Sequence, residues 1–108
     1  MIHEILPTEL AGKLNAGELV YLIDVRQEWE HALASLPNSV LIPLHQLPHR
    51  VQELQPPAGS LVVTYCHHGV RSLTAAEFLE RQGLGDVYSL AGGIDAWSLG
   101  IDRQVPRY

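Results

Sequence analysis

The chain has a single cysteine, Cys66, at a position where a nucleophile is well placed in an α/β protein. The apolar, β-favouring run Leu61–Tyr65 precedes it, and a short loop follows before a helical pattern begins. The thiolate is the reactive form of cysteine, but a free cysteine has a pKa of about 8.5, so its surroundings must favour the anion. The residues available for this are His67, His68, Gly69, Val70 and Arg71.

This loop can supply donors to an anionic sulfur. Backbone N–H groups where a tight loop opens into a helix have no intrahelical partner, and the helix dipole adds to their effect. Gly69 can adopt a positive φ and so turn several amides toward one point. We therefore expect the amides of residues 67–71 to cradle the sulfur and Arg71 to hold an anionic substrate. His67 and His68 are expected at the mouth of the site, either selecting donors or simply solvated.

Short apolar runs alternate with helical patterns along the chain. Strands are predicted at residues 19–25, 39–42, 61–65 and 86–90, and helices at 9–15, 27–33, 47–54 and 73–82, with a short helix around Trp97. Thr8 is the expected N-cap of the first helix, because threonine accepts hydrogen bonds from helix N-termini. This alternation predicts a mostly parallel sheet covered by helices, with Cys66 at the end of one strand.

Composition and charge exclude several function classes. With 108 residues, 46% of them hydrophobic, the chain is expected to form one domain over residues 1–108. A net charge of −5 without any Lys/Arg cluster argues against nucleic acid or a membrane surface as partner. One cysteine cannot form an internal disulfide, so a reducing compartment, by default the cytoplasm, is expected. Residues 1–20 contain neither a signal-peptide core nor a membrane span.

Three blocks of sequence follow one another over nearly the whole chain. They read Ile23-Asp24-Val25-Arg26 with Glu30, Cys66-x-x-Gly69-x-Arg71-Ser72, and Leu90-Ala91-Gly92-Gly93-Ile94-x-Ala96-Trp97. In this order they resemble the single-domain rhodanese family of sulfurtransferases, whose six-residue active-site loop has the length of residues 66–71. The resemblance implies an α/β fold: a five-stranded, mostly parallel sheet flanked by helices on both faces.

The resemblance also implies an activity. Cys66 would take a sulfane sulfur from a donor such as thiosulfate and hold it as a persulfide. It would then pass the sulfur to a thiophilic acceptor, which is cyanide, a thiol or a sulfur-carrier protein. Such a scheme is covalent and ping-pong. The implied partners are a small sulfur donor and, as one kind of acceptor, a protein; no cofactor is implied.

The other motif residues have structural interpretations. Arg26 and Glu30 lie about one helical turn apart and are expected to orient a loop, with the alternative that Arg26 shapes the rim of the pocket. Gly92-Gly93 is most simply a tight turn, and Trp97 a core anchor. The run Cys66-His67-His68 lacks the ligand spacing of a zinc site, so no metal is predicted.

The chain departs from the family pattern after a short helix. There Ala34-Ser35-Leu36-Pro37-Asn38-Ser39 stands where the family commonly has Gly-His-Ile-Pro-Gly-Ala. The histidine is lost, but Asn38 can still adopt the left-handed conformation of the turn. The tail Ile101–Tyr108 resembles the ending of rhodanese domains attached to adenylating enzymes that supply sulfur to ubiquitin-like carriers, which favours a protein acceptor.

Two other functions stay open. Tyrosine-type phosphatases place a cysteine and an arginine in a similar cradle, but with five residues between them, whereas four separate Cys66 from Arg71. The shorter loop suits one sulfur atom better than a phosphoryl group, and no Asp is evidently placed as general acid. The other alternative is a non-catalytic rhodanese-like binding or regulatory module, against which the retention of Cys66, Gly69 and Arg71 together argues.

Overall fold

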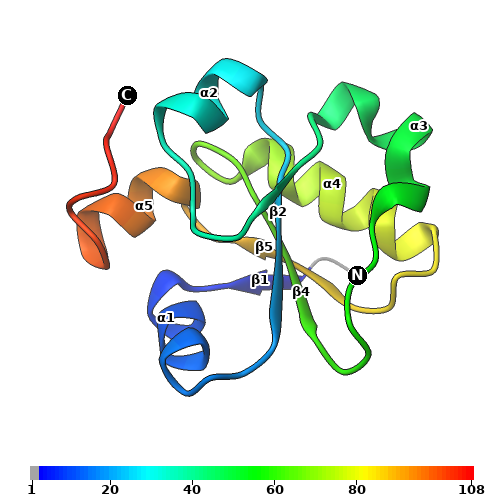
Figure 1. The fold of residues 1–108 in the computed structure, drawn as a ribbon, viewed down its shortest axis with the longest axis horizontal. Helices are drawn as coiled ribbons and strands as arrows, with labels where there is room; N and C mark the ends of the chain where they lie inside the picture. The colour runs from blue at the N-terminus through cyan, green and yellow to red at the C-terminus, as the bar shows by residue number, and fades with distance from the viewer. Residues whose placement is uncertain (1–2) are drawn as a thin grey trace.

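The central sheet is parallel throughout residues 3–108, the part of the chain that the computed structural model describes (Figure 1). Its order is β1-β5-β4-β2-β3, with β1 His3–Ile5, β2 Val20–Asp24, β3 Val40–Leu41, β4 Leu61–Tyr65 and β5 Val87–Leu90. The helices are α1 Pro7–Asn15, α2 Glu28–Leu33, α3 Leu47–Arg50, α4 Val70–Arg81 and α5 Gly93–Gly100, with 3-10 turns η1 Leu44–Gln46 and η2 Val51–Glu53. The predicted α/β class with five strands is confirmed.

Helices cover both faces of the sheet. Because successive strand residues point to opposite faces, β4 contributes to two cores. Val62 lies in the core that α3 and α4 cover, together with Cys66, whereas Val63 and Tyr65 lie in the core of α1 and α5. Figure 1 shows the same division, with α1 and α5 on one side of the strands and α3 and α4 on the other. Cys66 therefore lies at the carboxyl end of a strand that is buried on both faces.

The start of α4 differs from the prediction in a way that concerns the site. The helix begins at Val70 rather than at residue 73, because Gly69 has a φ of 107° and ends the loop there. Arg71 and Ser72 consequently belong to the first helical turn, where amides have no intrahelical partner. The loop after Cys66 is therefore shorter than predicted, because Arg71 and Ser72 belong to α4.

Three other predictions need correction. Thr8 is not an N-cap: α1 begins at Pro7, and the carboxylate of Glu9 accepts the N–H of Leu6 at 3.0 Å instead. The helix predicted over 47–54 divides into α3 and η2. β1 had no counterpart among the four strands predicted from the pattern, because three residues are too few to show a period. The left-handed conformation expected of Asn38 is confirmed, with a φ of 63°.

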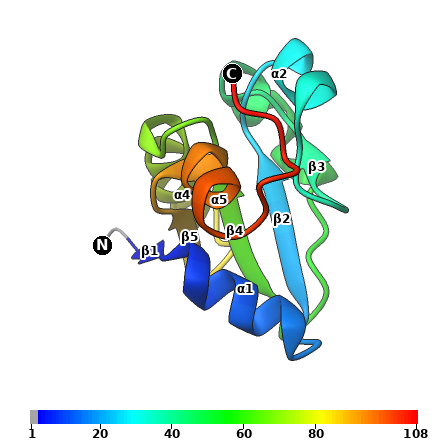
Figure 2. The ribbon, with the colours of Figure 1, turned by 90° about the vertical axis from the view of Figure 1, so that its left-hand side faces the viewer.

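The chain after α5 runs back across the molecule toward α2 (Figure 2). It is attached along the way, since the Ser98 hydroxyl donates to the carbonyl of Val105 at 2.6 Å and Arg107 pairs with Asp95 at 2.9 Å. This C-terminal tail, residues 101–108, brings Tyr108 beside the loop of Cys66. Within residues 3–108, no helix has the length and apolar composition that crossing a membrane requires.

Candidate active site

The sulfur of Cys66 lies among hydrogen-bond donors. The residue is only 1% exposed, and its Sγ accepts the backbone N–H of Gly69 at 3.1 Å and that of Ser72 at 3.3 Å. The hydroxyl of Ser72 lies 3.4 Å from the same sulfur. Amides that can only donate favour an anionic sulfur over a neutral thiol. Val70, the first residue of α4, is 75% exposed.

Two buried hydroxyls lie beside the sulfur. The Oγ atoms of Ser72 and Ser89 are 2.6 Å apart, and both residues are completely buried. Ser72 Oγ is also 3.2 Å from the carbonyl of Gly69. Each hydroxyl has one proton, so when Ser89 donates to Ser72, the Ser72 proton is free to turn either to the Gly69 carbonyl or to the sulfur. The pair can therefore offer a third donor to an anion at Cys66.

The N-terminus of α5 holds the loop from the side. The N–H of Ile94 donates to the carbonyl of Cys66 at 2.9 Å, and the N–H of Asp95 to that of His67 at 3.1 Å. Gly93 makes this approach possible: its φ is 63°, and a Cβ there would overlap both carbonyl oxygens. The Gly92-Gly93 turn thus brings helix amides onto the backbone that carries the nucleophile.

Arg71 forms an ion pair with Glu30 of α2. The two residues form a bidentate pair, with Nη1–Oε1 at 2.7 Å and Nη2–Oε2 at 2.9 Å. The hydrogen bonds from Arg71 lower the pKa of Glu30 to about 2, although burial of the carboxylate acts to raise it. Two of the five guanidinium N–H groups are used in this pair, and the remaining three have no partner within residues 3–108. Arg71 is therefore oriented by Glu30 and still has donors for a bound anion.

Arg26 lies beneath this pair and is completely buried. Its guanidinium forks onto Asp24, with Nε–Oδ1 at 2.8 Å and Nη2–Oδ2 at 2.7 Å, while Nη1 donates to the hydroxyl of Tyr108 at 2.7 Å. That hydroxyl in turn donates to Glu30 Oε2 at 2.7 Å. A continuous chain of hydrogen bonds thus leads from the core to the site through Asp24, Arg26, Tyr108, Glu30 and Arg71. Arg26 is thus linked to Glu30 and Arg71 through the hydroxyl of Tyr108.

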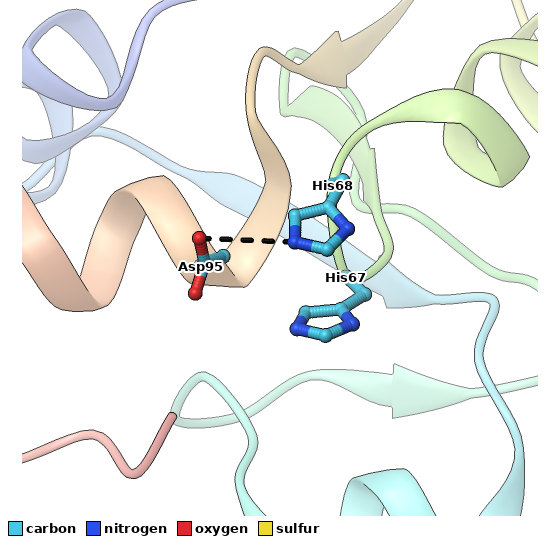
Figure 3. A group of neighbouring side chains, drawn as sticks. All are labelled: His67, His68 and Asp95. Atoms are coloured by element: carbon cyan, nitrogen blue, oxygen red, sulfur yellow. Dashed lines mark ion pairs between the residues drawn. The ribbon is translucent and has the colours of Figure 1, made fainter. Parts of the chain in front are cut away.

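The two histidines of the loop stack on each other. The ring centroids of His67 and His68 are 3.9 Å apart, and the ring of Tyr108 packs on the other face of His67 at 4.0 Å. Burial, with a smaller contribution from His68, lowers the pKa of His67, so its ring is neutral at pH 7. His68 is exposed, with Nε2 3.8 Å from Asp95 (Figure 3).

His67, His68 and Asp95 bring one possible metal-ligand atom each within 4.8 Å of one another (Figure 3). Their geometry is poor for a metal, because nearly parallel rings 3.9 Å apart, at an interplanar angle of 21°, do not point their nitrogen lone pairs at one centre. Asp95 is moreover paired with Arg107 at 2.9 Å. We assign no metal to this group; His3, Glu80 and Asp86 form a second group remote from the sulfur.

Sequence reasoning did not identify three contacts of the site. Glu30 was expected to orient a loop, but its partner Arg71, 41 residues away, was not identified. Ser89 carried no signal, since a serine in a buried strand is unremarkable in a sequence. Tyr108 lies in a tail whose path cannot be read from a pattern. All three contacts are made across the fold, and local periodicity does not report them.

Known proteins resemble this chain over most of its length. A family model described as Rhodanese-like domain matches residues 6–99. A sulfurtransferase of Allochromatium vinosum is 39% identical over 98 residues, covering 91% of this chain and 90% of that protein. The adenylyltransferase and sulfurtransferase uba4 of Ogataea parapolymorpha is 33% identical over 96 residues, which are 89% of this chain but 24% of that protein.

A solved structure extends the likeness to the whole fold. The rhodanese-like domain protein from Staphylococcus aureus superposes with a TM-score of 0.82 at 30% identity, and 99% of each chain is covered. These matches lead to the same family as two features of the site: a cysteine loop after a buried central strand, and an arginine in the first turn of the next helix. The chain belongs to the rhodanese-like domain family.

Proposed function

We propose that this protein is a sulfurtransferase that carries sulfane sulfur as a persulfide on Cys66. One observation carries the proposal: the Cys66 sulfur accepts the amides of Gly69 and Ser72 at 3.1 and 3.3 Å in a loop that ends in Arg71. Such donors stabilise the Cys66 thiolate, which is the form that attacks a sulfur donor. The family membership and a relative named sulfurtransferase support the same reaction class.

The proposed reaction has two balanced steps. The Cys66 thiolate attacks the outer sulfur of a donor such as thiosulfate; the new S–S bond forms as the old one breaks, and sulfite leaves with the bonding electron pair. The acceptor then attacks the outer sulfur of the persulfide, which restores the Cys66 thiolate. With cyanide the product is thiocyanate, and no outside oxidant or reductant is needed.

The loop residues take distinct roles in this scheme. The free N–H groups of Arg71 would hold the anionic donor, and the amides at Gly69 and Ser72 the anionic sulfur. His67 is neutral at pH 7 and would form part of the wall, whereas exposed His68 would meet the donor or acceptor at the mouth. The likeness to uba4 and the form of the tail favour a sulfur-carrier protein as natural acceptor, in a reducing compartment such as the cytoplasm.

Intact-mass spectrometry after incubation with thiosulfate tests this proposal. The expected result is the added mass of one sulfur atom, absent in Cys66→Ser and removed by cyanide as thiocyanate forms. An unchanged mass under these conditions, with a folded protein, would contradict the proposal and favour the non-catalytic binding module. Cys66-dependent hydrolysis of a phosphotyrosine analogue would instead favour the phosphatase.

A further inference from the structure

The C-terminal tail places Tyr108 in contact with both sides of the site. Its ring stacks on His67 at 4.0 Å with an interplanar angle of 10° and meets the ring of Trp29 edge-on at 5.8 Å. Its hydroxyl lies between Arg26 and Glu30, 2.7 Å from each. Figure 2 shows the tail running from α5 to α2 along this path. A residue of the tail therefore links the loop of Cys66 to α2.

The direction of the hydrogen bonds at this hydroxyl is fixed. Arginine has no acceptor, so Nη1 of Arg26 must donate and the Tyr108 oxygen must accept. Arg26 cannot turn away, because its guanidinium is completely buried and already forked onto Asp24. The single proton of Tyr108 is therefore directed at Glu30 Oε2.

Glu30 Oε2 is the atom that connects Tyr108 of the tail to Arg71. The same oxygen accepts Tyr108 Oη at 2.7 Å and Arg71 Nη2 at 2.9 Å. Without the hydroxyl, Glu30 loses one of the contacts that fix its plane, and more of its negative charge is left to neutralise Arg71. Both effects reduce the positive charge that Arg71 presents beside Cys66.

We propose that Tyr108 is a positioning residue that sets Arg71 through Glu30, so that the C-terminal tail tunes the site for anionic donors. The substrate class rests on the proposed sulfur transfer, but the electrostatic effect on Cys66 does not. Tyr108 touches neither the sulfur nor the donor in this scheme. Its influence passes through the two hydrogen bonds of its hydroxyl.

Alkylation of Cys66 measures this effect without any sulfur transfer. The rate with anionic iodoacetate divided by the rate with neutral iodoacetamide reports the charge beside the thiolate. In Tyr108→Phe the ring and its stacking stay, and we expect this ratio to fall about fivefold. Tyr21→Phe is the matched control, since among residues 3–108 its hydroxyl hydrogen-bonds the N–H of Gln55 alone, at 3.2 Å and away from the site. Its ratio should stay at the wild-type value.

A double-mutant cycle tests whether the effect passes through Glu30. In a Glu30→Gln background, Tyr108→Phe should no longer change the iodoacetate to iodoacetamide ratio. The proposal is overturned if Tyr108→Phe has a normal melting curve and a wild-type ratio. It is also overturned if Tyr108→Phe lowers the ratio by the same factor in the Glu30→Gln background as in the wild type.

Donor kinetics extend the test to sulfur transfer. In Tyr108→Phe, KM for thiosulfate should rise about fivefold with little change in kcat, while a neutral organic trisulfide is used as in the wild type. An equal rise for both donors overturns the assignment to anionic donors. If wild-type protein fails to load sulfur at all, the proposed function fails, and the alkylation ratio still decides the role of Tyr108.

Discussion

At the scale of single residues, the site is built to hold negative charge on one atom. Two amides reach the sulfur of Cys66, and the hydroxyl of Ser72 lies 3.4 Å away. Ser89 can donate its own proton to the Ser72 oxygen, so the Ser72 proton stays available for the sulfur. A fixed set of donors stabilises the Cys66 thiolate without reorganisation, both as the attacking group and as the group released when sulfur leaves.

Ser72→Ala tests the third donor. Loss of the hydroxyl should lower kcat/KM for sulfur transfer by about tenfold, less than the loss of a full oxyanion-hole donor. It also leaves the buried Ser89 without its partner, which should cost about 1–3 kcal/mol of unfolding free energy. Steady-state kinetics and urea denaturation measure the two effects.

Ser39→Ala is the matched control for this change. Its hydroxyl contacts the Leu36 carbonyl and the Tyr65 hydroxyl, each at 2.8 Å, and not the sulfur. We expect this variant to lose stability but to keep its transfer rate. Equal losses of rate in both variants would show that Ser72 acts only through stability.

The pair of Glu30 and Arg71 predicts a pH dependence of stability. The pKa of Glu30 is about 2 in the folded protein and 4.5 ordinarily, because Arg71 favours the carboxylate. Ionised Glu30 therefore stabilises the fold above pH 4.5, and this contribution, about 3 kcal/mol at most, is lost as the pH falls from 4.5 to 2. Urea denaturation over this range should show a steeper decline for the wild type than for Glu30→Gln. Parallel declines would contradict the assignment.

At the scale of elements, two helix N-termini meet at the loop of Cys66. The first turn of α4 supplies the Ser72 amide to the sulfur, while α5 donates to the carbonyls of Cys66 and His67. One helix thus holds the reacting atom and the other holds the backbone beneath it. The close approach of α5 depends on the missing side chain of Gly93.

Gly93→Ala should therefore be one of the most damaging small changes in the chain. A Cβ at a φ of 63° is strained and overlaps the Cys66 and His67 carbonyls, so we expect a loss of more than about 3 kcal/mol in unfolding free energy. Gly12→Ala, in the exposed middle of α1 with nothing within 4 Å, should instead stabilise by about 0.5–1 kcal/mol. Denaturant melts of the two variants compare them, and similar values would refute the packing argument.

The elements themselves were largely predictable from the sequence, whereas their contacts were not. Buried strands such as β2 and β4 are recognisable in the sequence as apolar runs. β1 has three residues and no period, and the true start of α4 depends on backbone geometry at Gly69. Contacts such as Tyr108 to Glu30 span 78 residues, and no local pattern contains them.

At the scale of the whole molecule, Cys66 follows β4, which is paired on both sides, and lies near the C-terminal tail, which is attached by few contacts. β4 pairs with β2 on one side and β5 on the other, so every residue of the strand is held within the sheet. The tail on the outside is attached by a few contacts, chiefly those of Ser98, Arg107 and Tyr108. We expect these two regions to open with very different free energies.

Native-state hydrogen exchange measures this difference. Amides of β4 should exchange only through global unfolding, whereas those of the tail should exchange through local opening. Tyr108→Phe removes two hydrogen bonds from the tail and should speed exchange there without changing β4. Equal protection of tail and strand would mean that the fold opens as one unit.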